Sequence, residues 1–116
     1  MYDTFPVVLE GRDALAGMVV GERHQGLIHA GAAHLLGLPH IQLDGDTAVV
    51  TNYSQLVLKN DDDTFRIWRT GVNRWHFVRT AEGWKATRRV NRQLDGTDEG
   101  RAILAAAVDP SAPAVD

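Results

Sequence analysis

Histidine is the residue type in this sequence that most invites a chemical interpretation, because imidazole both ligates metals and exchanges protons near neutral pH. Four of the five histidines fall within seventeen residues, at His24, His29, His34 and His40. The first two steps, of five residues each, alternate between the faces of a strand and turn by about 140° around a helix, so neither geometry directs these side chains to one ion. The spacing therefore predicts no metal site.

Other reactive groups are also missing from the sequence. The chain has no cysteine, and neither Ser54 nor Ser111 lies in a G-x-S-x-G elbow. Residues 26–37 are rich in glycine and alanine but contain neither G-x-G-x-x-G nor a GK[ST] ending. We therefore expect no thiolate or serine nucleophile, no nucleotide site and no cofactor.

Basic residues are concentrated between positions 66 and 92. Eight lie there against the single acid Glu82, so the segment carries +7 and the rest of the chain, with a total of −3, carries −10. Interleaved aromatic residues would suit a single-stranded nucleic acid, but binders of that kind are usually basic overall. Arginines on an outer sheet face, paired with acids of other strands or of a partner subunit, explain the run better. An anionic substrate tail is the remaining alternative.

The composition is that of one ordinary globular domain. In 116 residues, 44% are hydrophobic and 23% charged. No apolar run approaches the roughly 20 residues that a membrane helix needs, and the first residues lack the basic and apolar parts of a leader. We expect a single domain over residues 1–108, a disordered tail over 109–116, no membrane partner and a cytoplasmic location.

The first half of the chain predicts a short strand, a helix and a hairpin. Residues 7–10 suit a strand, and 11–20 place apolar residues on one helical face, with Gly21 available to end it. Apolar residues continue over 32–43 up to Asp44-Gly45, a pair that favours a tight hairpin turn.

The second half predicts long antiparallel strands and a closing helix. Residues 47–58 are rich in Val, Thr and Tyr and end at a polar tip over 59–63. Residues 64–79 and 84–94 form another strand pair, and 97–108 suit a short helix. Strands this long, joined by tight turns, build a strongly curved sheet, so the fold class is α+β.

Three stretches together resemble the SnoaL-like group of the nuclear-transport-factor-2-like superfamily, which includes scytalone dehydratases, polyketide cyclases and small subunits of ring-hydroxylating dioxygenases. They are residues 11–15, the run from His34 through Asp44-Gly45-Asp46-Thr47-Ala48 to Tyr53, and residues 71–92 with Glu82-Gly83-Trp84. The resemblance covers about residues 2–95. It implies a cone-like half-barrel of mainly antiparallel sheet with short helices around an apolar pocket.

The chain departs from that pattern at its start. Family members usually begin with two helices that cover the pocket and often supply a carboxylate, whereas Met1 falls where those helices would already have ended. Either the sequence is part of a longer protein or a partner chain covers the opening. We therefore expect a homodimer or a higher homo-oligomer, because exposed apolar sheet is rarely left to water.

The resemblance also implies three catalytic candidates. His34 lies where the dehydratase-like members place a strand histidine, which could take a proton from a carbon next to a carbonyl; the alternative is a strand histidine that merely bonds a backbone carbonyl. Asn73 matches an asparagine that bonds the polar end of the substrate, although it could equally be a sheet residue. Tyr2 resembles a tyrosine that holds a reacting oxygen. The second histidine of scytalone dehydratases, due near residues 56–59, is missing.

Strand alternation extends this candidate site. If no bulge intervenes, Arg69, Asn73 and Trp75 share the pocket face, where Arg69 could meet a ligand carboxylate, while Arg66 and Arg74 lie outside. We expect Arg69, Trp75 and Tyr53 to contact the ligand. Two hypotheses follow: a lyase, isomerase or cyclase that acts by proton transfer on a small apolar carbonyl or polycyclic compound, or a non-catalytic ligand-binding or assembly subunit.

Overall fold

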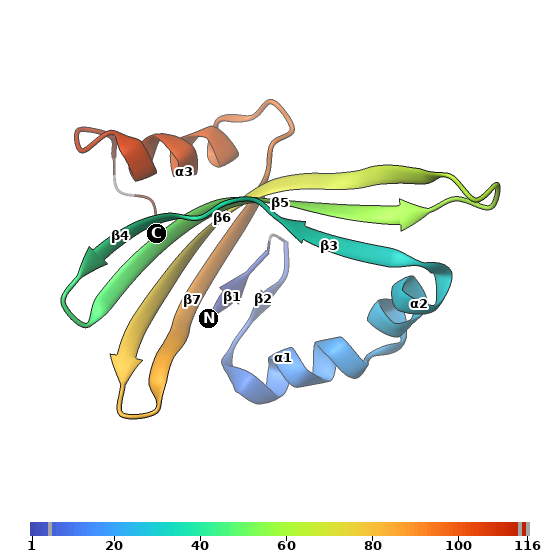
Figure 1. The fold of residues 1–116 in the computed structure, drawn as a ribbon, viewed down its shortest axis with the longest axis horizontal. Coiled ribbons are helices and arrows are strands. Elements are labelled where there is room, and N and C mark those ends of the chain that lie inside the picture. The colour runs from blue at the N-terminus through green and yellow to red at the C-terminus, as the bar shows by residue number, and fades with distance from the viewer. Residues whose placement is uncertain (5, 114, 116) are drawn as a thin grey trace.

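The chain folds around one large, curved sheet with helices on both of its faces (Figure 1). The computed structural model describes residues 1–4, 6–113 and 115. Its elements are β1 (Tyr2–Asp3), β2 (Val8–Leu9), α1 (Gly11–Val20), α2 (Glu22–Ala30), β3 (Ala32–Leu36), β4 (His40–Asp44), β5 (Thr47–Lys59), β6 (Phe65–Thr80), β7 (Gly83–Gln93) and α3 (Asp98–Val108). This confirms the α+β class that the sequence predicts.

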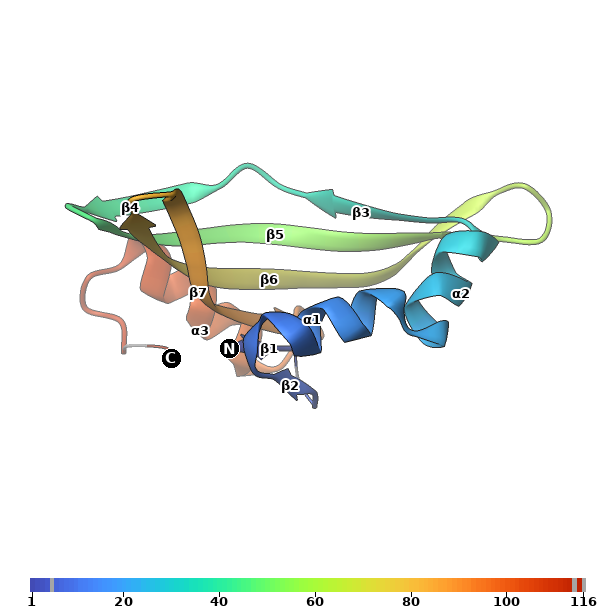
Figure 2. The same ribbon diagram turned by 90° about the horizontal axis from the view of Figure 1, so that it is seen from below.

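Three long strands joined by tight turns form the centre of the sheet. The strand order is β2-β1-β7-β6-β5-β3, and β4 follows β3 along the same edge of β5 (Figure 2). The predicted turn between β4 and β5 is present, with Gly45 at a φ of 56°, a conformation that glycine adopts without strain. The β5–β6–β7 meander is antiparallel throughout.

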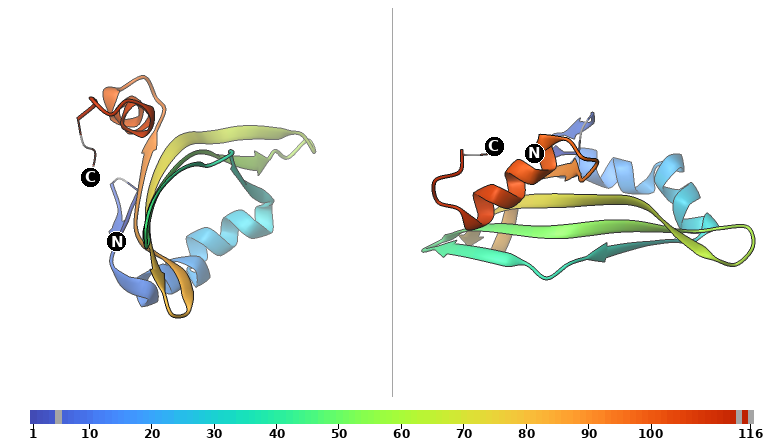
Figure 3. Two further views of the ribbon diagram at one scale, coloured as in Figure 1. Left: turned by 60° about the vertical axis from the view of Figure 1, so that its left-hand side comes forward. Right: turned by 90° about the horizontal axis from the view of Figure 1, so that it is seen from above.

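The sheet bends around α1 and α2, and α3 lies against its opposite face (Figure 3). Val72 of β6 and Val90 of β7 pack against Ile103 of α3, and all three side chains are almost fully buried. These three residues are the centre of the hydrophobic core, which therefore lies on the convex face. No residue of α1 or α2 is buried, but Leu56 and Leu58 of β5 are, so the concave face is covered near α2 and open toward β4, where Ile41 and Leu43 are exposed.

A β-bulge in β6 changes one of the expected face assignments. Leu56 aligns with Arg69, but Val57 aligns with Ile67, which leaves Trp68 as the extra residue. Alternation is therefore reset at Trp68, and Arg66 aligns with Leu58 on the same face as Arg69. The expectation that Arg66 lies on the outer face is wrong for this reason, whereas Arg74 does lie on the convex face, in line with Val72 and Val90.

Two features of the N-terminal half are not predicted from the sequence. A second helix, α2, follows α1 after Gly21. The two-residue strand β1 pairs in parallel with β7, with Tyr2 beside Arg89, and β2 then pairs antiparallel with β1. These short strands bring the start of the chain to the edge of the concave face.

The C-terminal tail after α3 makes contacts with the rest of the chain. In the described part of the tail, Ala112 N–H donates to the Asp109 carbonyl, and Val115 packs against the core of Val72, Val90 and Ile103. Among the described residues, no helix has both the length and the apolar character to span a membrane.

Candidate ligand-binding face

A row of three asparagines crosses the centre of the sheet. Asn52 of β5 aligns with Asn73 of β6, which in turn aligns with Asn91 of β7. Aligned residues of neighbouring strands project from the same face, so the three amides form a line on the concave face. All three residues are buried, and Asn73 has no exposed surface.

The side-chain oxygen of Asn73 is the centre of a hydrogen-bond network. Its Oδ1 accepts from Asn91 Nδ2 at 2.8 Å and from Nε and Nη2 of Arg89 at 2.9 and 2.7 Å. The neighbouring Asn52 Oδ1 accepts from Trp75 Nε1 at 3.1 Å. Because three donors already converge on it, the Asn73 oxygen orients Arg89 rather than meeting a ligand directly.

The guanidinium of Arg89 lies between two aromatic rings. Its central carbon is 4.5 Å from the centre of the Tyr2 ring and 4.7 Å from that of Trp75, which is cation–π geometry on both sides. Burial lowers the pKa of Arg89 to about 10. Within the described residues, no carboxylate pairs with this cation.

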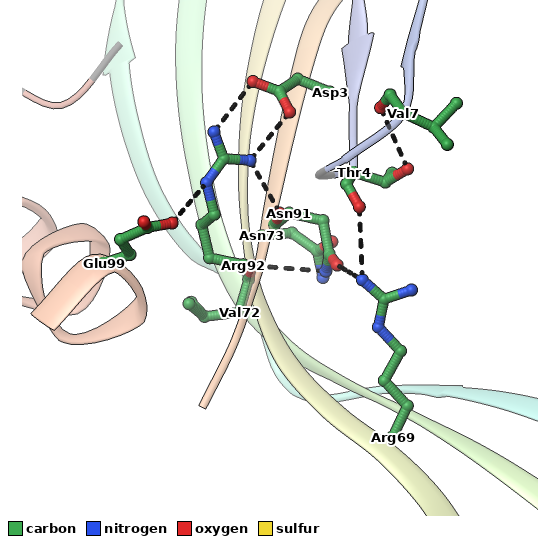
Figure 4. Close-up of polar contacts among 9 residues, drawn as sticks. All are labelled: Asp3, Thr4, Val7, Arg69, Val72, Asn73, Asn91, Arg92 and Glu99. Carbon is green, nitrogen blue, oxygen red and sulfur yellow. Dashed lines mark hydrogen bonds and ion pairs between the residues drawn. The ribbon is translucent and has the colours of Figure 1, made fainter. Parts of the chain in front are cut away.

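Arg69 joins the same network at its other end. Its Nη2 donates to Asn91 Oδ1 at 3.1 Å and to the Thr4 carbonyl at 3.4 Å (Figure 4). Its Nε is buried without a partner among the described residues. Arg69 and Asn91 also line a cavity of about 220 Å³ that extends to the start of α3, where Asp95 and Glu99 lie.

An ion pair fixes β1 beside β7 and so holds Tyr2 in place. Both terminal nitrogens of Arg92 donate to the carboxylate of Asp3 at 2.9 Å, and Arg92 Nε lies 3.3 Å from Glu99 (Figure 4). The hydrogen bond to Asp3 raises the pKa of Arg92 above its ordinary value.

Two apolar rows lie next to the asparagines on the concave face. The first continues from Arg89 through Trp75 and Val50 to Ile41, and the second runs through Ala86, Phe77, Ala48 and Leu43. The rings of Trp75 and Phe77 stack with centres 6.0 Å apart. Ile41 and Leu43, at the far edge, are 58% and 64% exposed. This face thus presents open apolar surface beside a polar network.

His34 lies on the same face but at the other end of the sheet. The register places it roughly four residues along and two strands across from Asn73, which is roughly 16 Å between Cα atoms at ordinary sheet spacing. The His34 ring is exposed and stacks on His24 of α2, with ring centres 6.1 Å apart. Tyr53 aligns with Val72 and so belongs to the convex face, where it lines a cavity of about 350 Å³ at the sheet edge.

The comparisons with known proteins identify the family. A model described as the SnoaL-like domain matches residues 1–90. The chain belongs to the SnoaL-like family. No curated protein sequence matches this SnoaL-like chain.

Solved structures agree with this assignment. An NTF2-like protein with a cystatin-like fold from Novosphingobium aromaticivorans is 38% identical, with a TM-score of 0.85, over 89% of this chain and 67% of its own. A Mycobacterium tuberculosis protein of unknown function is 20% identical, with a TM-score of 0.67, over 92% of this chain and 64% of its own. The beta subunit of a putative aromatic-ring-hydroxylating dioxygenase, also from N. aromaticivorans, is 20% identical, with a TM-score of 0.52, over 70% of this chain and 52% of its own.

The basic residues between positions 66 and 92 of this SnoaL-like domain fall into two groups, those paired with acids and those without such a partner among the described residues. Arg79 pairs with Asp46, Lys85 with Glu82, and Arg92 with Asp3 and Glu99. Arg74 and Arg88, on the convex face, carry buried nitrogens that bond to none of the described residues. No group of three or more histidine and acidic side chains that could hold a metal ion occurs in the described part of the chain.

Sequence reasoning finds part of this face and misses its cation. Asn73, Tyr2, Trp75 and Arg69 come together in one network, whereas His34 and Tyr53 lie apart from it. Arg89, Asn91 and Asn52 were not singled out. Counting from the predicted hairpin tips does not align the asparagines, because six residues separate Asn52 from the 59–63 tip and nine separate Asn73 from it. No signal in the sequence distinguishes Arg89 from the other arginines either.

Proposed function

We propose that this SnoaL-like protein binds a small, largely apolar molecule on its concave face, with the polar end of that molecule toward the asparagine row. The observation that carries the proposal is the pair of apolar rows beside the buried polar network. Strands lie about 4.8 Å apart and alternate residues about 7 Å apart, so two rows across four strands cover roughly 14 by 7 Å. That area suits a compound of two or three fused rings.

Binding is better supported than catalysis by the positions of the candidate residues. A base must lie within hydrogen-bond reach of the proton it removes, and a polarising amide must reach the adjoining carbonyl. His34 and Asn73 are roughly 16 Å apart by register, too far for both to act on neighbouring atoms. The Asn73 oxygen is also fully engaged within the protein.

Binding of a neutral two-ring probe, 2-naphthalenemethanol, measured by equilibrium dialysis, tests the proposal. Ile41→Lys should weaken binding at least about tenfold, because it places a charge in the first apolar row. Tyr53→Lys is the matched control, since Tyr53 is 51% exposed on the opposite face and Ile41 is 58% exposed. No saturable binding to the unmodified protein, or equal weakening by both substitutions, would contradict the proposal.

A second candidate function is proton transfer by His34, as in a lyase, isomerase or cyclase. The observation that favours it is the stacked pair of imidazoles, His24 and His34, on the ligand-binding face. A molecule of three or more rings that reached from Arg89 toward β3 would bring a distant carbon near this pair. In that case His34→Gln should abolish turnover of a polycyclic ketone while leaving its binding unchanged, whereas Tyr2, together with Arg89 oriented by Asn73, would hold the other end.

We also propose that the protein assembles into a homodimer or a higher homo-oligomer. The β3–β4 edge carries exposed apolar side chains, among them Leu36, Leu38 and Leu43 at 64%, 94% and 64% exposure. Contiguous apolar surface of this kind is typical of an interface. The two apolar rows reach this edge at Ile41 and Leu43, so assembly through β4 would cover the outer end of the ligand-binding face while leaving Arg89 and Trp75 open.

A further inference from the structure

We infer that the molecule bound on the concave face is an anion, and specifically a planar carboxylate on an apolar ring system, whose charge is received by Arg89. The inference rests on the proposed function, because it names the chemical class of the ligand for that same face. It is carried by three observations: the position of Arg89, the donors it has left, and the lack of a counter-charge in the protein.

Arg89 stands at the end of the first apolar row. It aligns with Trp75, which aligns with Val50, and Ile41 completes the row across four strands. A ring system lying over Trp75 and Val50 therefore has one of its ends beside the guanidinium. No other cation lies in either apolar row.

The guanidinium of Arg89 retains one complete edge of donors. An arginine has five N–H groups in a planar fork, and Nε and one Nη2 hydrogen of Arg89 are directed to Asn73 Oδ1. Nη1 donates to none of the described residues, so Nη1 and the second Nη2 hydrogen form a free pair of parallel donors. Two parallel N–H groups match the two oxygens of a carboxylate.

The aromatic rings restrict how an anion approaches this edge. The rings of Tyr2 and Trp75 occupy the two flat sides of the guanidinium, at 4.5 and 4.7 Å. An anion can therefore approach only in the plane of the fork. A planar carboxylate attached to an aromatic ring fits that slot better than a tetrahedral phosphate does.

Charge balance points to the same ligand. Arg92, a neighbour in the same strand, is paired with Asp3 and Glu99, whereas no carboxylate of the described residues pairs with Arg89, whose hydrogen-bond acceptor is the neutral Asn73 Oδ1. A partly buried charge without a counter-ion is unfavourable, and the pKa of Arg89, lowered by burial to about 10, reflects that cost. Arg89 is still a cation at neutral pH, and a ligand carboxylate would supply the missing charge.

The test compares two ligands of the same shape, 2-naphthoate and 2-naphthalenemethanol, by isothermal titration calorimetry at low ionic strength. We expect the unmodified protein to bind 2-naphthoate at least about tenfold more tightly than the alcohol. Arg89→Met should remove this preference while still binding the alcohol. Arg74→Met is the control, because Arg74 is a half-buried arginine on the convex face and should keep the preference.

The outcomes separate the two proposals. Equal affinity of the unmodified protein for both ligands overturns the inference and leaves the proposed function standing. Binding of neither ligand overturns the proposed function and the inference with it. A preference for 2-naphthoate that survives in Arg89→Met assigns the anion to another group and overturns the role of Arg89. If Arg89→Met does not fold, the ligand comparison on the unmodified protein still decides whether the ligand is an anion, and loss of the preference in Arg89→Lys, which keeps the charge but not the paired donors, assigns it to Arg89.

Discussion

The neutral amide oxygen of Asn73 accepts hydrogen bonds from the Arg89 guanidinium, although a carboxylate would pair with that cation more strongly. At the scale of single residues, this choice is what leaves Arg89 available to a ligand. A carboxylate at position 73 would pair with Arg89 inside the protein, and the remaining edge of the guanidinium would attract an anion far less strongly. The amide thus positions the arginine without neutralising it.

Asn73→Asp tests that role. We expect the variant to fold and to bind 2-naphthalenemethanol, but to lose at least about tenfold in affinity for 2-naphthoate, because the new carboxylate repels the ligand and neutralises Arg89. Asn73→Ala should instead lower the free energy of unfolding by about 2 to 3 kcal/mol, since it removes the acceptor of three buried or half-buried donors. Calorimetric titration and thermal unfolding give both results. Unchanged 2-naphthoate affinity in Asn73→Asp would refute the electrostatic argument.

The lowered pKa of Arg89 predicts how anion binding depends on pH. The folded-state pKa of about 10 lies below the ordinary value of an arginine, so between the two values the unfolded chain binds more protons and this group makes folding more favourable as pH rises. The cation itself persists below about pH 10. Affinity for 2-naphthoate should therefore be constant from about pH 6 to 9 and fall above about pH 10.

The neutral alcohol serves as the control for this pH series, because its binding needs no cation and should not fall with the loss of the Arg89 charge. A loss of 2-naphthoate affinity already between about pH 6 and 8 would show that a histidine, rather than Arg89, carries the interaction.

At the scale of elements, the site depends on a two-residue strand. β1 pairs with β7 through Tyr2 and Asp3, and the Asp3–Arg92 ion pair ties it down with side chains only 16% and 19% exposed. Removing this bidentate contact should detach β1 and withdraw the Tyr2 ring from Arg89. The N-terminal strand is thus part of the binding face and not merely an extension of the sheet.

Arg92→Met should lower the free energy of unfolding by about 1 to 3 kcal/mol and weaken 2-naphthoate binding. Arg101→Met is the matched substitution, because the Arg101–Asp98 pair is 64% and 96% exposed and should contribute about 0 to 1 kcal/mol. Chemical denaturation measures both variants. If Arg92→Met were as stable as Arg101→Met, the ion pair would not hold β1.

The elements that the sequence predicts are those with strong local signals. The Asp44-Gly45 turn and the three long strands follow from turn chemistry and from β-branched residues. β1 and β2 are too short to show an alternating pattern. The helix α2 has weak signals, because it contains Gly26 and its N-cap residue, Gly21, has no side chain to cap the helix. The bulge at Trp68 cannot be predicted from the sequence, because the order of residues along the strand is the same with or without the bulge.

The candidate site is predictable only in part, because the sequence does not show which residues of neighbouring strands lie side by side. Asn73, Tyr2, Arg69 and Trp75 follow from the family resemblance and from alternation along one strand. Arg89 looks like seven other basic residues nearby, and what distinguishes it is its place between the Tyr2 and Trp75 rings, which depends on pairing between strands. The sequence does not show which residue of the neighbouring strand lies beside Tyr53 and therefore does not place Tyr53 on either face. In the structure it aligns with Val72, on the convex face.

At the scale of the whole molecule, the exposed edge predicts assembly. Light scattering at micromolar concentration should give a multiple of 12.7 kDa, the mass of one chain. Leu38→Lys should shift the equilibrium toward single chains, because Leu38 is 94% exposed on the β3–β4 edge. Val20→Lys, at a site 72% exposed on α1, should leave the mass unchanged. A mass of 12.7 kDa for the unmodified protein would contradict the proposed assembly.

Binding on the concave face is the central claim, and the three tryptophans report on it directly. Trp75 lies in the first apolar row, Trp68 occupies the bulge and Trp84 lies at the β6–β7 turn. The decisive measurement is a titration of ¹⁵N-labelled protein with 2-naphthalenemethanol, followed through the three indole N–H signals. We expect the Trp75 signal to shift progressively and saturate while the Trp68 signal stays in place. A Trp75 signal that does not move, or a shift confined to Trp68, would contradict binding on this face.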